Sequence, residues 1–145
     1  MDSSGTGPRL AAWGRGAAMA VLVLAALNWV GWSIGRQVLT RLNSAWPHMV
    51  PWTALWLAAL GVSILLQYGR PSRGRVWFGR AVAVAVAASA GVALATDVSG
   101  RSLGGFDQVW FGEAVRTLHS AWPGRPNVQT AATVLLLAGA AALIR

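Results

Sequence analysis

The sequence contains no cysteine and no lysine, and only four of its 145 residues are acidic. The absence of cysteine excludes disulfide bonds, thiolate nucleophiles and cysteine-ligated metal centres. The twelve basic residues are all arginines, and charged residues make up 11% of the chain, compared with about 25% in an average soluble domain. Because 55% of the residues are hydrophobic, too few polar side chains remain to cover a water-exposed surface. The composition therefore predicts a membrane protein.

Four apolar segments have the length expected of membrane spans, at about residues 17–34, 52–67, 76–96 and 128–144. A helix needs roughly 20 apolar residues to cross the hydrocarbon core of a bilayer. Residues 1–16 are expected to form a flexible cytoplasmic lead. The first segment is also compatible with a signal peptide, but Asn28, Trp29 and Trp32 stand where a small-residue cleavage site would be. We therefore expect an all-α domain over residues 17–145, a four-helix membrane bundle.

The distribution of arginine predicts how these spans are oriented. Seven arginines lie on the side that carries both termini and the 68–75 turn, whereas five lie in longer connections that also carry three acidic residues. Because arginine is enriched in cytoplasmic loops, both termini are expected to be cytoplasmic. The arginines form no continuous basic face, so the net charge of +8 does not indicate a nucleic-acid partner. The abundance of alanine, glycine and arginine is typical of a bacterial protein, here one of the cytoplasmic (inner) membrane.

A six-residue motif occurs twice, as LNSAWP at 42–47 and as LHSAWP at 118–123. Each copy is followed by a Thr-Ala pair that begins a long apolar run. We interpret the chain as two parallel helix-pair repeats, with both motif copies at the outer ends of the second and fourth spans. The residues that define the repeat are Ser44, Trp46, Pro47, Thr53, Ser120, Trp122, Pro123 and Thr130.

Small residues recur every four positions along the third span, at Gly79, Ala83, Ala87, Gly91 and Ala95. A stripe of this kind lets helix backbones approach closely, so it is expected to face the bundle or a dimer partner. The high alanine content of the span also produces such spacing without any role in packing. If the stripe mediates assembly, Gly91→Leu disrupts it.

Two histidines and two predicted helix starts are the candidate ligand-binding features. His48 and His119 lie beside the two motif copies and titrate near neutral pH, which would make a proton sensor if the halves bring them together. The helix starts at Trp52 and Val128, with Arg125 nearby, offer unpaired N–H groups for an anionic ligand. The alternatives are that both histidines have no role, that polar residues only cap the helices, and that the arginines meet lipid phosphates.

No catalytic motif is present, and no carboxylate or lysine lies within the apolar runs. Ion carriers and proton pumps usually need such a group at mid-depth, so active transport is disfavoured. The sequence also lacks a nucleophile elbow, a phosphate-binding loop and a zinc-binding helix motif. We expect no enzymatic activity, no cofactor and no metal site.

Several short elements resemble the four-helix membrane input region of bacterial signalling proteins. Residues 49–55 (MVPWTAL) resemble that family's Met-x-Pro-Asn-Thr-Ala-Leu element, and 123–131 (PGRPNVQTA) and 100–107 (GRSLGGFD) are similar to later elements. In that family the four helices precede a diguanylate cyclase, a histidine kinase or a serine phosphatase. The chain departs from the pattern at Trp52, where the family has Asn, and at Thr96, where it has an acidic residue. Its 145 residues contain no output module.

The resemblance implies a non-catalytic sensory or input module for signal transduction, which acts as a homodimer or with a cytoplasmic signalling partner. Two alternatives remain open from the residues themselves. One is a small permease-like or channel-forming subunit, and the other is a membrane scaffold that holds partner proteins. All three place the chain in the lipid bilayer.

Overall fold

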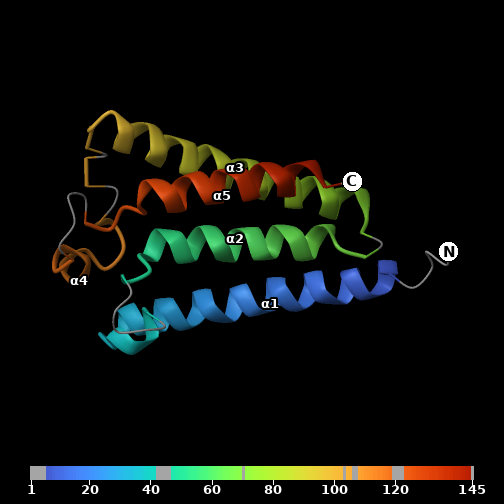
Figure 1. Ribbon diagram of the computed structural model, residues 1–145, viewed down its shortest axis with the longest axis horizontal. Coiled ribbons are helices and arrows are strands. Elements are labelled where there is room, and N and C mark those ends of the chain that lie inside the picture. Colours follow the sequence, from blue (N-terminus) through green and yellow to red (C-terminus); the bar gives the residue numbers. More distant parts are fainter. Residues whose placement is uncertain are drawn as a thin grey trace.

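The computed structural model describes residues 6–41, 47–69, 71–102, 104–105, 108–118 and 123–144. Over these residues the chain forms five α-helices and one 3-10 helix, and no β-strand. The elements in order are α1 (Thr6–Ser33), η2 (Gln37–Leu39), α2 (Pro51–Gln67), α3 (Arg73–Val98), α4 (Gly112–Arg116) and α5 (Val128–Leu143). Figure 1 shows the four long helices side by side, with α4 at one end and the start of α1 at the other. The all-α class expected from the sequence is confirmed.

Local sequence signals explain where the helices begin. Pro51 occupies the first turn of α2, where its missing N–H group has no intrahelical partner in any case. Ser72 caps α3 by accepting a hydrogen bond from the N–H of Arg75 at 3.4 Å. Asn127 caps α5, since its Oδ1 accepts from the N–H of Thr130 at 2.8 Å. Such caps satisfy backbone donors that the helix itself leaves unpaired.

The first helix is longer than the sequence predicts. α1 begins at Thr6, inside the stretch 1–16 that was expected to be a flexible lead. Pro8 falls in the first helical turn, where proline is tolerated, and the following Leu-Ala-Ala-Trp favours continued helix. The glycines that suggested flexibility are separated by good helix formers, so the helix continues through them.

The helices pack in an order that places α2 at the centre. α1 packs on α2, α2 packs on both α3 and α5, and α3 packs on α5. The buried core comprises Trp56, Leu60, Ala83, Val86, Ala90, Ala93, Ala131, Val134, Ala138 and Ala141. Because six of these ten side chains are alanines, the backbones of α3 and α5 approach closely.

The small-residue stripe of α3 does not follow one face of the helix. Gly79 and Ala83 are buried, Ala87 and Gly91 are partly buried, and Ala95 is exposed. Four residues turn a helix about 40° beyond one full turn, so a strict four-residue spacing rotates out of the core. The positions that stay buried alternate steps of four and three: Gly79, Ala83, Val86, Ala90 and Ala93.

Two glycines mark the closest helix contacts. A Cβ at Gly61 would lie 3.2 Å from Cγ of Leu22 and 3.3 Å from the carbonyl oxygen of Ala18, where α1 crosses α2. A Cβ at Gly79 would lie 2.8 Å from Cγ of Gln67, where α3 crosses α2. Larger residues at these positions would force the helices apart.

Buried hydrogen bonds connect α2, α3 and α5 near the α1-start end of the bundle. The Ser63 hydroxyl donates to the carbonyl oxygen of Gly79 at 2.7 Å. The Gln67 amide donates to the Ser63 hydroxyl at 3.1 Å and to the carbonyl oxygen of Ala141 at 3.1 Å. These bonds link three helices through two polar side chains that are shielded from solvent.

The surfaces of the long helices are apolar. Residues Ala12–Ser33 and Arg73–Val98 are each long and apolar enough to cross a membrane, and α2 and α5 are shorter apolar helices of 17 and 16 residues. In both longer helices only 22% of the apolar window is buried, whereas a core helix of a soluble protein would be mostly buried. Exposed apolar side chains include Val23 and Val30 of α1, Val84 and Val92 of α3, and Leu136 of α5. These features favour a membrane location.

Candidate functional site

The α4 end of the bundle carries the connections that hold the repeated motif. Of the motif residues, Pro47, Thr53, Pro123 and Thr130 are described by the structure. The others, Ser44, Trp46, Ser120 and Trp122, lie outside the described residues, as does His119. Among the candidate residues, the structure therefore places the four described motif residues, His48 and Arg125.

A cavity of about 460 Å³ lies between the two halves at this end. The first half contributes Pro47, His48, Met49, Val50 and Thr53 to its lining, and the second half contributes Leu118, Arg125, Pro126, Asn127 and Thr130. The corresponding residues Thr53 and Thr130 therefore line one cavity, whereas Pro123 is partly buried and outside the lining. The first turns of α2 and α5 both reach the cavity.

The two helix starts at the cavity differ in their caps. Asn127 caps α5 through its side chain, whereas Val50 stands at the N-cap of α2 and forms no side-chain cap hydrogen bond. The dipoles of both helices place partial positive charge toward the cavity. Arg125 also belongs to the lining, and among the described residues no acidic side chain does. The two helix starts and the Arg125 guanidinium therefore direct hydrogen-bond donors and partial positive charge toward the cavity.

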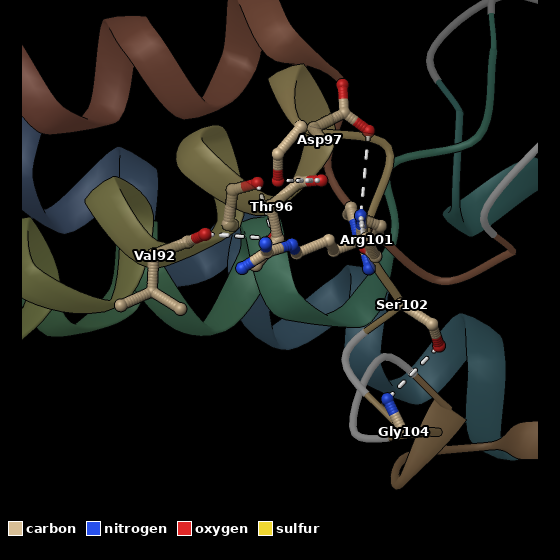
Figure 2. A network of polar contacts seen from close by, with 9 residues as sticks. Val92, Thr96, Asp97, Arg101, Ser102 and Gly104 are labelled. Carbon is tan, nitrogen blue, oxygen red and sulfur yellow. Dashed lines mark hydrogen bonds and ion pairs between the residues drawn. The ribbon is translucent and has the colours of Figure 1, made fainter.

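Arg125 is held in place from the end of α3. Its side chain is only 1% exposed, and Nη1 lies 3.8 Å from Oδ1 of Asp97 and donates to the carbonyl oxygen of Arg101 at 3.2 Å. Figure 2 shows this end of α3, where the Thr96 hydroxyl donates to the carbonyl oxygen of Val92 at 2.9 Å. Asp97 follows Thr96 in the sequence and is the acidic residue that pairs with Arg125.

His48 lies between this cavity and a second one of about 220 Å³, which is lined by residues of α1 and α4 and by Leu118. Its Nδ1 is 2.6 Å from the Thr40 hydroxyl, and its ring centroid is 6.1 Å from that of Trp32. Burial, and to a smaller extent the charge of Arg41, lowers the pKa of His48 below its ordinary value of 6.5. Burial therefore favours the neutral form of the ring.

Two side chains of α1 hold the segment that enters α2. The Asn28 amide and the Trp32 indole N–H both donate to the carbonyl oxygen of Met49, at 3.0 and 2.9 Å. The N–H of Met49 donates in turn to the carbonyl oxygen of Thr40 at 2.8 Å. These contacts position His48, the residue before Met49, at the wall of the cavity. In the sequence, Asn28 served only as an argument against a signal-peptide cleavage site. Its polarity within an apolar run is the signal that marks its role.

Aromatic rings join α4 to α1 at the same end. The Trp29 ring packs edge-on against Trp110 at 5.2 Å and against Phe111 at 5.5 Å, and Trp32 stacks on Phe111 at 6.5 Å. Phe111 adopts a left-handed backbone conformation (φ 56°), which starts α4 directly after the loop. The segment around α4 thus covers the end of α1 that carries Trp29 and Trp32. Tryptophan is common at membrane interfaces.

Within the described residues, no cluster of three or more histidine and carboxylate side chains is arranged to hold a metal ion. No protein-family model, no curated protein and no solved structure matches the chain. The lining of the cavity, with one imidazole, two threonines and the ion-paired Arg125, is therefore the main guide to function.

Proposed function

We propose that the chain is a multi-pass membrane protein that acts as a non-catalytic sensory or input module for signal transduction. Its stimulus would act at the cavity between the two halves. The observation that carries this proposal is that the corresponding residues of the two halves, Thr53 and Thr130, line one cavity at the starts of α2 and α5. An occupant there contacts both halves at once.

The helix order supports transmission from the cavity to the opposite end. α2 packs on α1, α3 and α5, so a displacement of its first turn changes three helix interfaces. A sensor requires two packings close in free energy that the stimulus stabilises differently. The interfaces of α2 suit this requirement, because small residues and a few specific hydrogen bonds accompany the larger core side chains Trp56 and Leu60.

The charge distribution supports an orientation with the α4 end outside. In the sequence, seven arginines lie on the side of both termini and the 68–75 turn, and the described residues at that end include no acidic side chain. The α4 end has five arginines, accompanied by Asp97 and Glu113. An excess of arginine marks the cytoplasmic side. The exposed rings of Trp13 and Trp77 at the arginine-rich end fit a second interfacial belt.

Cysteine labelling tests this topology, since the chain contains no native cysteine. Ser33→Cys and Ser99→Cys place exposed thiols at the α4 end, and Gly74→Cys places one at the opposite end. In intact cells a membrane-impermeant maleimide should label the first two and not the third. Labelling of Ser33→Cys and Ser99→Cys from opposite faces would contradict the four-span arrangement.

Distance measurements test the sensory function. Spin labels at Trp13→Cys and Leu143→Cys, both highly exposed in the structure, report the separation of α1 and α5 at the end remote from the cavity. Thr53→Trp partly fills the cavity and should shift this distance by about 1–2 Å, the scale of helix shifts in switching proteins. Leu136→Trp, on the exposed face of α5, is the matched control. An unchanged distance with Thr53→Trp would favour a passive scaffold.

A further inference from the structure

A third hollow lies at the arginine-rich end, on the side of α2 that faces both α1 and α5. It is an apolar groove of about 350 Å³. Its lining includes Gly14, Ala17 and Val21 of α1, Gly61 of α2, and Ala140 and Ile144 at the end of α5. α1 and α5 both pack on α2 but make little contact with each other, so their small residues leave the groove open.

The length of the groove indicates what fits it. Along α1 it extends from Gly14 to Val21, and along α5 from Leu137 to Ile144. Seven helical residues rise about 10 Å, roughly a third of the ~30 Å hydrocarbon core. The groove therefore lies within one leaflet. A spanning helix from a second copy would need contact over most of the core, whereas one acyl chain of a lipid occupies a single leaflet.

Two arginines lie beside residues that line the groove, although neither belongs to the lining itself. Arg15 follows Gly14 and lies 5.9 Å from the centroid of the Tyr68 ring, and Arg80 donates from Nη2 to the carbonyl oxygen of Ile144 at 2.8 Å. Nε of Arg80 is buried and has no hydrogen-bond partner. Over the described part of the chain, neither arginine forms an ion pair. Two cations beside an apolar groove are complementary to an anionic amphiphile.

We propose that this groove binds an anionic phospholipid of the cytoplasmic leaflet. One acyl chain lies along Ala17, Gly61 and Ala140, and the phosphate accepts hydrogen bonds from Arg15 and Arg80. The site rests on the membrane location proposed above and is separate from the cavity at the α4 end. It makes the lipid composition of the cytoplasmic leaflet a second input to the packing of α1 and α5 on α2.

Native mass spectrometry of the full chain in detergent tests the charge at this site. Palmitoyl-oleoyl phosphatidylglycerol should bind more tightly than the phosphatidylcholine with the same chains. Each arginine near an anionic headgroup strengthens binding about fivefold, so Arg15→Gln combined with Arg80→Gln should weaken phosphatidylglycerol binding about 25-fold. Binding of phosphatidylcholine should weaken less, because the choline cation offsets the charge of its phosphate. Arg101→Gln combined with Arg116→Gln removes the same charge at the other end and should have no effect. Equal binding of the two lipids to the wild-type chain would overturn the proposal.

Filling the groove tests the acyl-chain contact. Ala140 is exposed in the groove, so Ala140→Phe should fold normally and weaken binding of both lipids. Leu136→Phe, on the exposed face of α5, should not. Ala17→Val gives a smaller filling if the helical content or melting temperature of Ala140→Phe is reduced. If inorganic phosphate displaces the lipid, the site is a simple anion site. If the chain is a dimer and Ala140→Phe abolishes the dimer, a second copy fills the groove. Either result overturns the proposal.

Failure here is distinguishable from failure of the proposed function. Lipid preference in detergent depends on neither topology nor the cavity, so equal lipid binding alongside the expected labelling of Ser33→Cys, Ser99→Cys and Gly74→Cys refutes the lipid site alone. A chain that stays monodisperse in buffer without detergent would instead refute the membrane location, and with it both proposals.

Discussion

Ser63 of α2 donates its hydroxyl proton to the carbonyl oxygen of Gly79 in α3 at 2.7 Å, across the closest contact between these helices. A side chain at residue 79 would collide with Gln67 and with the carbonyl oxygen of Ser63. Gly91, on the same small-residue stripe, has no heavy atom closer than 4.0 Å to the position of a Cβ. The two glycines therefore differ in what they contribute to packing.

We expect Gly79→Ala to lower the free energy of unfolding by about 1–3 kcal/mol, the usual cost of overpacking. Gly91→Ala should be neutral or stabilise the helix by up to about 1 kcal/mol, because alanine is the better helix former. Thermal unfolding in detergent, followed by circular dichroism, measures both. If both variants lowered the free energy of unfolding by similar amounts, the stripe of α3 would be in close contact along its whole length, as a dimer interface would require.

The ion pair between Asp97 and Arg125 should stabilise the cavity wall. Asp97→Asn removes the carboxylate that lies 3.8 Å from the buried Arg125 guanidinium and should cost about 1–3 kcal/mol. Arg125→Gln in the Asp97→Asn background should cost less than Arg125→Gln alone, since the pair is already broken. A double-mutant cycle on chemical unfolding gives the coupling. Strictly additive losses would mean that the 3.8 Å pair contributes nothing.

The stability of the chain should depend on pH through His48. Burial lowers the pKa of His48 in the folded protein below 6.5, so the unfolded chain binds a proton at a higher pH than the folded chain does. The stabilisation is complete above about pH 6.5 and is lost as the pH falls toward the folded-state pKa. Melting temperatures should be compared between pH 7.5 and 5 in a His119→Gln background, with and without His48→Gln. The same decline in both proteins would assign the effect to other groups.

Two valines on the exposed face of α3 distinguish a bilayer from water as the surrounding medium. Val84 lies near the middle of α3 and Val98 at its end, and both are exposed. In a bilayer, Val84→Lys should oppose insertion by about 2.5–3.5 kcal/mol, whereas the lysine of Val98→Lys reaches the interface at little cost. Membrane fractions of cells that express each variant report insertion. If Val84→Lys remained fully inserted and stable, α3 would not face lipid at this depth.

Much of the secondary structure follows from local sequence. α2 begins at Pro51 and α5 at Val128, compared with the expected starts at 52 and 128, because a proline in the first turn and an asparagine cap act within a few residues of the boundary. The start of α1 was not predicted, since the glycines of 1–16 favoured a flexible segment. A helix tolerates isolated glycines at about 1 kcal/mol each when the residues between them are good helix formers.

The site is less predictable from sequence. The repeat identified Thr53 and Thr130 as corresponding residues, but their shared cavity depends on α2 and α5 lying parallel and adjacent. The roles of Asn28 and Asp97 depend on contacts with residues 21 and 28 positions away along the chain, at Met49 and Arg125. No local pattern records such partners.

The sequence by itself determined that the chain is helical and apolar and where α2 and α5 begin, because helix propensity, capping and hydrophobicity act within a few residues. Only the tertiary structure decided which face of α3 is buried, which residues meet at the cavity between the halves, and that a groove remains between α1 and α5. These features depend on the rotation and crossing of helices that are distant in sequence, and small residues permit several such arrangements until close contacts such as that of Gly79 select one.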